Sequence, residues 1–318
     1  MLINRKFLYF GAFFVAIGGV LVAADLAGVE ARTILDALQL WPLVIVAIGL
    51  GIVLRRTEFG LPAGVLAAVA PGLLIGGGFA LAPRIATDCE AVGAPATVTT
   101  EQGVFDGPAS VSVASGCGSL IVSTTPGNGW HLERSAAGRA PIIDASSRSL
   151  SIDAGGHNWW SRVEADRDPW RLTLPTTEIE DLSIVVNAGE GLMTLPGARL
   201  GSLDVTTNAG STSVDLSETS VASLTGTVNA GMLSVRLPTA DVVGSLEINA
   251  GALELCVPEA VGLRIRHDGA LGGITINGVD ETRTDWQSPN YASATHHADM
   301  TIDVNLGGVE INPIGGCK

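Results

Sequence analysis

The hydrophobic residues follow two different patterns along the chain. Residues 1–83 are almost all apolar and carry few charges, whereas apolar and polar residues alternate over much of residues 84–318. An apolar stretch of about 20 residues has the length that a helix needs to cross a bilayer. Alternation is typical of strands with one buried face. The sequence therefore predicts a mixed fold, with membrane α-helices followed by an all-β region.

Three apolar stretches in the first region are candidate transmembrane helices. They cover about residues 7–26, 38–54 and 61–81. The first stretch also fits a signal peptide, because Arg5 and Lys6 precede it. Two further stretches follow directly, which favours a retained helix and a three-helix transmembrane region over residues 1–83.

Charged residues around these stretches predict their orientation. Arg5 and Lys6 precede the first helix, and Arg55 and Arg56 lie between the second and third. Basic flanks stay on the cytoplasmic side. We therefore expect a multi-pass cell-membrane protein in contact with membrane lipid. Its N-terminus is cytoplasmic, and a linker over residues 84–103 leads to an extracytoplasmic domain.

The second region repeats itself about every 20 residues. The tripeptide Asn-Ala-Gly recurs with spacings of 21, 21 and 20 residues, and the flanking residues keep register. Glycine adopts positive φ at low cost and asparagine bonds neighbouring backbone groups, so we interpret the tripeptide as a structural turn between two strands. The residues of these turns are Asn187, Gly189, Asn208, Gly210, Asn229, Gly231, Asn249 and Gly251.

One such pair of strands cannot bury its own apolar face, so the repeats must stack. This predicts a right-handed β-solenoid with rungs of about 20 residues over residues 104–314. Residues 111–122, 263–276 and 300–311 match as degenerate rungs, and the last of these is expected to close the array. Stacked asparagine side chains are expected to form a hydrogen-bonded ladder.

Two stretches interrupt the repeat, at about residues 125–172 and 279–299. They contain the tryptophans that we take as a candidate partner surface: Trp159, Trp160, Trp170 and Trp286. The alternative is that these rings cover the open ends of the apolar core, because terminal repeats of a solenoid must be capped.

Charge and cysteines narrow the classes of partner and compartment. The net charge is −14, and residues 84–318 hold 28 acidic against 13 basic residues. Nucleic acid would be repelled by this charge, whereas a basic partner is compatible with it. An extracytoplasmic domain permits disulfides, and four cysteines allow three pairings; free buried thiols are the alternative. The four cysteines are Cys89, Cys117, Cys256 and Cys317.

The sequence holds no pattern that indicates catalysis. It lacks a nucleophile elbow, a phosphate-binding loop and a zinc-protease helix motif. His296, His297 and Asp299 could hold a metal, but adjacent residues on a strand face opposite sides, so neither a metal nor a cofactor is expected. We therefore expect a protein that is not an enzyme.

Several short motifs resemble a known family. The motifs are residues 40–43 (Leu-Trp-Pro-Leu) with Gly49 and Gly51, the Asn-Ala-Gly turns, residues 172–175, and Asn290-Tyr291 ahead of residues 300–311. Together they resemble LiaF-type envelope stress proteins with a toastrack, or adhesin-like, β-solenoid. The resemblance implies a bacterial membrane protein that senses or modulates envelope stress by binding a protein partner.

Three functions are consistent with these patterns. The first is a non-catalytic, stress-sensing or regulatory scaffold whose solenoid binds an envelope protein. The second is a cell-surface adhesin or self-assembling solenoid, which would form homo-oligomers because exposed strand edges can pair between chains. The third is an envelope hydrolase that uses His157, His296 and His297 of the two interruptions.

Overall fold

The computed structural model divides the chain into two compact units, Met1–Thr87 and Asp88–Lys318. The residues that the structure describes are 11–16, 18–19, 22, 49, 54, 64–65, 67–73, 98–135, 140–155, 169–281 and 283–314.

The first unit does not show the expected membrane helices. Its longest described helical runs are 11–16 and 67–73, which touch where Gly72 lies against Phe13 and Ala16. No described helix is long and apolar enough to cross a membrane. A run of seven residues rises only about 10 Å, against a hydrocarbon core of about 30 Å.

The prediction of a three-helix transmembrane region, and with it the multi-pass membrane localisation, is therefore wrong for the part of the chain that the structure describes. Much of the three predicted spans, 7–26, 38–54 and 61–81, lies outside the described residues. The apolar composition indicates residues that avoid water, but it does not by itself fix an unbroken helix of spanning length.

The second unit is built from strands. They are β1 Val98–Val104, β2 Ala109–Thr125, β3 Gly129–Ser135, β4 Ile142–Ala145, β5 Ser149–Asp153, β6 Trp170–Pro175, β7 Ile179–Thr194, β8 Arg199–Thr207, β9 Gly210–Asp215, β10 Ser220–Val228, β11 Gly231–Arg236, β12 Val242–Ile248, β13 Gly251–Cys256, β14 Val261–Ile276, β15 Val279–Glu281, β16 Asp285–Gln287 and β17 His296–Ile311.

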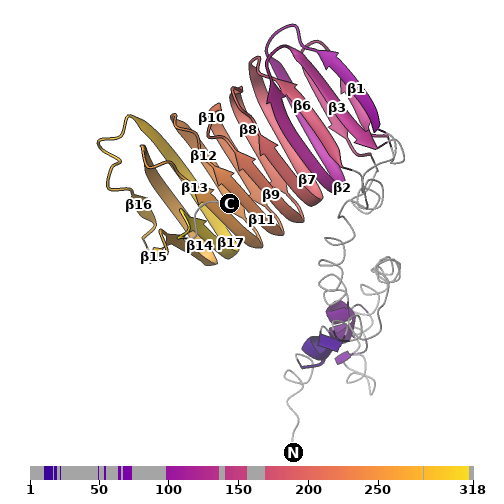
Figure 1. Cartoon of the computed structure of the whole chain (residues 1–318). Coiled ribbons are helices and arrows are strands. Elements are labelled where there is room, and N and C mark those ends of the chain that lie inside the picture. The colour runs from indigo at the N-terminus through magenta and orange to yellow at the C-terminus, as the bar shows by residue number, and fades with distance from the viewer. Residues whose placement is uncertain are drawn as a thin grey trace, which may run out of the picture. The chain divides into compact units, whose positions relative to one another are not determined.

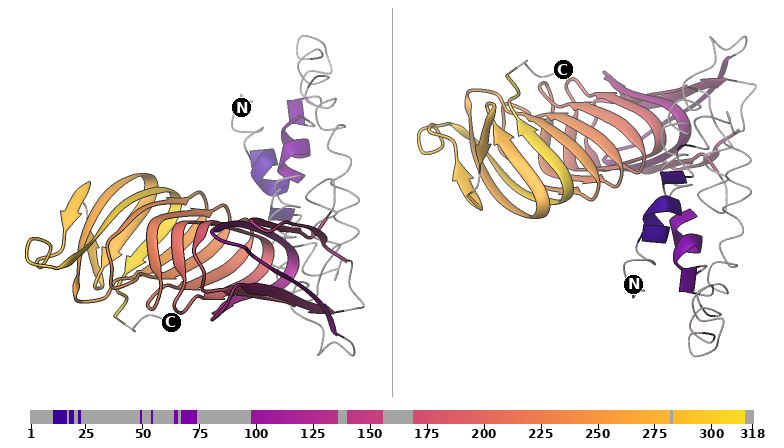
Figure 2. Two further views of the ribbon diagram at one scale, coloured as in Figure 1. Left: turned by 90° about the horizontal axis from the view of Figure 1, so that it is seen from above. Right: turned by 90° about the horizontal axis from the view of Figure 1, so that it is seen from below.

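These strands form a β-solenoid with two faces (Figures 1 and 2). Along one face the pairing runs β4–β5–β2–β7–β8–β10–β12–β17–β14–β16. Along the other it runs β1–β3–β6–β2–β7–β9–β11–β13–β17–β14–β15. The central pairs are parallel and in register. Long strands such as β7 pass through the turn and belong to both faces.

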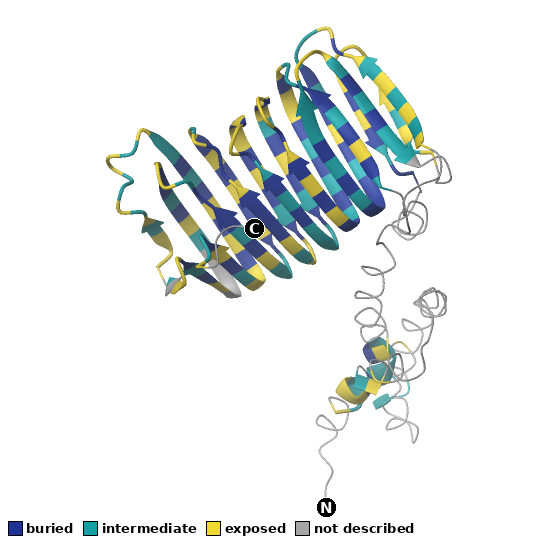
Figure 3. Ribbon diagram, in the orientation of Figure 1, coloured by how far each residue is buried: buried dark blue, intermediate teal, exposed yellow. Residues whose placement is uncertain are grey.

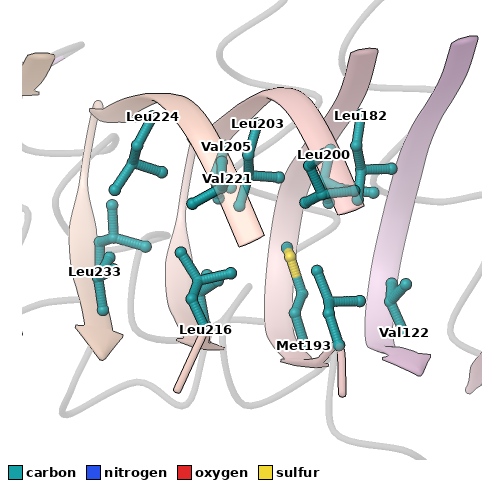
Figure 4. Close-up of a cluster of buried hydrophobic side chains, with 14 of the residues drawn as sticks. Val122, Leu182, Met193, Leu200, Leu203, Val205, Leu216, Val221, Leu224 and Leu233 are labelled. Atoms are coloured by element: carbon teal, nitrogen blue, oxygen red, sulfur yellow. The ribbon is translucent and has the colours of Figure 1, made fainter. Parts of the chain in front are cut away.

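Buried and exposed residues alternate along the strands (Figure 3), and the buried side chains form one continuous core between the faces. Leu182, Leu203 and Leu224 are each 1% exposed and form a row that faces Met193 and Leu216 of the other face (Figure 4). Burying each such side chain contributes roughly 1.5–3 kcal/mol. The core is therefore what holds one rung on the next, as the repeat predicted.

The first and last long strands do not lie at the ends of the solenoid. β17 pairs with β12 and β13 on one side and with β14 on the other. β2 likewise lies between β7 and the β5 and β6 pair. The expectation that residues 300–311 form the last rung is therefore wrong, since β14 is last. The alternation identifies a rung, but it does not fix the stacking order.

The interruptions contain more regular structure than the sequence indicated. Within residues 125–172 lie β3, β4 and β5, and residues 84–103, expected as a linker, include most of β1. β1, β3 and β4 pair antiparallel to their neighbours and continue the two faces at the N-terminal end. Their sequences lack the Asn-Ala-Gly turn, so the repeat could not reveal them.

Candidate functional site

The repeated asparagines lie in a hydrogen-bonded ladder along one edge of the solenoid. Each side-chain amide donates to the side-chain oxygen of the preceding rung, and the first donates to the backbone oxygen of Ser115 at 2.7 Å. The members are Asn187, Asn208, Asn229, Asn249 and Asn305, with N···O distances of 2.9, 2.7, 2.9 and 2.9 Å between successive pairs. Sequence reasoning missed Asn305, although the spacing Asn-x-Gly at Asn305 and Gly307 marks it.

The glycines of these turns also have a structural role. Gly189, Gly210, Gly231 and Gly251 have φ of 105, 122, 132 and 156°. A Cβ atom on Gly210, Gly231 or Gly251 would collide with the backbone oxygen of the preceding rung's glycine. The stacked turns therefore leave no room for a side chain between successive rungs.

The tryptophans divide between the ends of the core. Trp170 is 2% exposed and, with Trp130 and Phe105, is buried at the N-terminal end. It covers the core there, so it is not part of an accessible partner surface. Trp286 of β16 is half-buried and packs against the core at the other end. Trp159 and Trp160 lie outside the described residues.

Two of the four cysteines are described, and both are disulfide-bonded: Cys117 and Cys256. They are not bonded to each other. Four rung steps separate their strands, which is about 19 Å at the spacing of paired strands and far beyond the reach of a disulfide. Cys89 and Cys317 lie outside the described residues.

The most concentrated polar cluster lies where β16 leads into β17. We call residues 285–297 the strap. Tyr291 donates its hydroxyl hydrogen to Asp299 Oδ1 at 2.8 Å. The Arg264 guanidinium lies 4.4 Å above the centre of the Tyr291 ring and 3.6 Å from the Asp299 carboxylate. Cation, ring and carboxylate thus fasten the strap to the last two rungs.

The start of β17 is fixed by a second set of contacts. The His297 backbone N–H donates to Asp241 Oδ1 at 2.7 Å, and its ring Nε2 lies 2.9 Å from the Tyr291 carbonyl oxygen. The rings of His296 and His297 approach Asp241 to 3.8 and 3.9 Å. Within the described residues, no group of three His, Cys, Asp or Glu side chains is placed to hold a metal ion.

The electrostatics of the cluster favour a protonated tyrosine. Partial desolvation raises the pKa of Tyr291, and the hydrogen bond to Asp299 and the charge of that carboxylate raise it further, against the opposing charge of Arg264. The hydroxyl therefore acts as a hydrogen-bond donor at neutral pH. A tyrosine in this state is a poor nucleophile or base, so the cluster is suited to holding the strap.

Two carboxyl groups elsewhere on the solenoid have shifted pKa values, and burial and neighbouring groups explain both shifts. Burial raises the pKa of Asp204, partly offset by a hydrogen bond from Thr206. Burial acts in the same direction on Asp215, but hydrogen bonds from Ser217 and the charge of Arg236 outweigh it and lower the pKa. Both lie on the regular faces, and neither indicates a reactive site.

A cavity of about 320 Å³ lies beside the strap at the C-terminal end of the solenoid. Core residues such as Val261 and Ile311 form part of its lining, together with Trp286, Ser288, Pro289 and Asn290 of the strap. Cavity and strap together form the candidate functional site.

The fold and this end site define a β-solenoid repeat protein with an irregular, polar end. Residues 109–238 match the family model of the N-terminal domain of toast_rack, DUF2154. That segment runs from β2 to the turn after β11, so the chain contains a toastrack-type domain.

Solved structures with a similar fold have low identity to the chain. A candidate cell adhesion protein from Clostridium sporogenes ATCC 15579 is 16% identical, with a TM-score of 0.43, over 68% of this chain and 100% of that one. A candidate adhesin from Parabacteroides merdae ATCC 43184 is 11% identical, with a TM-score of 0.29, over 70% of this chain and 98% of that one. Identities and TM-scores this low do not allow the function of those proteins to be assigned to this chain. No curated protein matches the chain.

Proposed function

We propose that the chain is a non-catalytic binding scaffold of the bacterial cell envelope that takes part in sensing or regulating envelope stress. Its C-terminal end, formed by the strap and the cavity, contacts a protein partner. The observation that carries this proposal is the division of polar groups. The regular turns use theirs in the asparagine ladder, whereas the strap gathers aromatic and charged groups at one end of the solenoid.

The disulfides support an oxidising location. Cys117 and Cys256 are both bonded, and disulfides persist in extracellular and periplasmic proteins but rarely in a reducing cytoplasm. The acidic net charge of −14 is consistent with a basic partner and disfavours nucleic acid.

The toastrack-type domain agrees with the resemblance to LiaF-type stress proteins. The motif that points to that family in particular, residues 40–43, lies outside the described residues. The stress-related part of the proposal therefore rests on the sequence resemblance alone, and the binding part rests on the end site.

The cluster at the strap supports a binding role over a catalytic one. Its most polar groups are engaged with each other: the Tyr291 hydroxyl with Asp299, and the His297 ring with the Tyr291 carbonyl. A general base needs a free lone pair within reach of a substrate proton. The hydrolase alternative therefore has little support in the described part of this site.

A self-assembling adhesin is the second candidate, and one observation favours it. The outer edge of β1 has no strand partner among the described residues, and Val98 and Val104 are 54% and 58% exposed. Exposed edges of this kind pair between chains. Light scattering on the full chain at high concentration tests this candidate, and a strictly monomeric chain would exclude it.

Mild crosslinking in cells followed by purification of the full chain tests the scaffold proposal. We expect one envelope protein to be recovered repeatedly, in amounts that change under envelope stress. Recovery of the chain alone, with and without stress, would refute a scaffold role.

A further inference from the structure

One column of equivalent residues, which lies inside the solenoid in successive rungs, changes from apolar to polar at the C-terminal end. In the inner rungs, the residue that follows the second strand is a buried leucine: Leu195, Leu216 and Leu237 are 1%, 0% and 0% exposed. The next rung has Val257, which is 9% exposed. In the last two rungs, those of β17 and β14, asparagine takes this position.

These two asparagines are Asn312 and Asn277. Both have φ of 49°, and among the described residues they are the only non-glycine residues with positive φ. Asn312 Oδ1 accepts a hydrogen bond from the Val257 N–H at 2.8 Å, and the Asn277 N–H donates to the Ile311 carbonyl oxygen at 2.9 Å. Asn277 and Gly278 form the two-residue turn between β14 and β15, in which asparagine followed by glycine ordinarily has positive φ.

No leucine fills the corner at these two rungs, and the cavity of about 320 Å³ lies there. Its size is at the lower end of ligand pockets, which begin near about 300 Å³. The apolar part of its lining includes Val257, Ile276, Trp286 and Ile311. Ile314 lies beside Gly278 at the same end and is 83% exposed, which extends the apolar surface outside the cavity.

The polar groups of the lining fall into two sets. Asn290 is satisfied internally, because its amide donates to the carbonyl oxygens of Glu259 and Val261 and its oxygen accepts from Ser288. The exposed side chains of Glu259 and Asn277 have no partner among the described residues. A primary amide offers a donor and an acceptor together, which is what a peptide group requires.

We propose that this cavity binds an extended peptide segment of a protein partner, with one bulky apolar side chain in the cavity and a basic residue beside it. The apolar lining takes the side chain, the Asn277 amide bonds the peptide backbone, and the Glu259 carboxylate pairs with the basic residue. The net charge of −14 favours a basic segment. The inference rests on the proposed function and names the class of partner.

A short peptide tests the inference on the full chain. The probe is acetyl-Gly-Lys-Leu-Lys-Gly-amide, titrated to millimolar concentration and followed by NMR at the Trp286 indole N–H, whose signal is assigned by its loss in Trp286→Phe. We expect a saturable shift. Replacing the central leucine of the probe by alanine should weaken binding about tenfold or more, and replacing both lysines by glutamate should abolish it.

Matched variants locate the charge effect. Glu259→Lys should weaken binding at least fivefold, whereas Glu247→Lys, an equal charge change at an exposed position of β12, should leave it within twofold. Equal weakening in both variants would show general attraction to an acidic surface and overturn the inference. No shift at millimolar probe would also overturn it. A crosslinked partner found in cells together with either result would leave the scaffold role standing and exclude this cavity as the place where the partner binds.

Discussion

Asn305 donates its side-chain amide to Asn249 Oδ1 at 2.9 Å, although 56 residues separate them in the chain. The pair is the last step of the asparagine ladder, and it exists because β17 lies against β12 and β13. The chain thus forms β14 and the strap before it returns to complete the rung between β13 and β14. The end site is therefore held by strands that are distant in sequence.

The ladder predicts the effect of removing one asparagine. Asn229→Ala should lose the bonds to Asn208 and Asn249. Each net hydrogen bond contributes about 0.5–1.5 kcal/mol, so we expect a loss of about 1–2 kcal/mol in the free energy of unfolding. Urea denaturation followed by circular dichroism measures it. Thr225→Ala, an outward substitution on β10, the strand that precedes this turn, is the control, and an equal loss there would contradict a specific ladder.

The crowded turns predict a larger effect at glycine. Gly210 has φ of 122°, and a Cβ there would collide with the Gly189 carbonyl oxygen. Gly210→Ala should therefore cost roughly 3 kcal/mol, because backbone strain and a steric clash act together. Gly107→Ala, where nothing lies within 4 Å of the added carbon, should be nearly neutral. A neutral Gly210→Ala in the same urea titration would refute the in-register stacking.

The strap cluster predicts a titration. The pKa of Tyr291 is raised by desolvation and by Asp299. The stability that this linkage contributes is present below the unfolded tyrosine pKa and is lost as the pH rises through the higher folded value. Asp299→Asn should move the pKa of Tyr291 downward, as followed by the NMR signal of its ring carbon.

Asp303→Asn is the matched control for that titration, because Asp303 is an exposed carboxylate on the same strand. It should leave the pKa of Tyr291 unchanged. A pKa that is equally lowered in both variants would assign the shift to the general acidity of the face and not to the cluster.

The disulfides predict a pairing. Asn312 is tied to Leu255 and Val257 by hydrogen bonds. Cys317 follows Asn312 by five residues, which keeps it within reach of Cys256 but not of Cys117, which lies four rungs beyond Cys256. Mass spectrometry of the unreduced chain should find Cys256 linked to Cys317, and Cys117 to Cys89. Peptides that link Cys117 to Cys317 would contradict the rung order.

The sequence predicted the parts of the fold that repeat. The register of the Asn-Ala-Gly turns and the alternation of residues such as Leu203 and Val205 require stacked rungs, because a single rung cannot bury them. The stacking order of β2, β14 and β17 was not predictable, since any rung presents the same apolar pattern to its neighbours. The apolar composition of the first region led to a wrong prediction of spanning helices, because hydropathy does not establish the length of a helix.

The end site was visible in the sequence only in part. The sequence predicts an irregular segment around Trp286, but it also predicts that Trp170 shares a surface with Trp286, whereas Trp170 is buried at the opposite end. The cluster of Arg264, Tyr291 and Asp299 joins three elements. No local pattern marks such a contact. Asn277 and Asn312 could have been noticed as the places where the leucine column ends.

The central claim is that a partner binds the C-terminal end of the solenoid and not its regular faces. A photoreactive amino acid placed at Gln287 of the strap, or at Thr225 on a regular face, tests this most directly in cells. Both positions are exposed. We predict that one protein is captured from position 287 and not from position 225. Capture from 225 alone, or equally from both, would contradict the account.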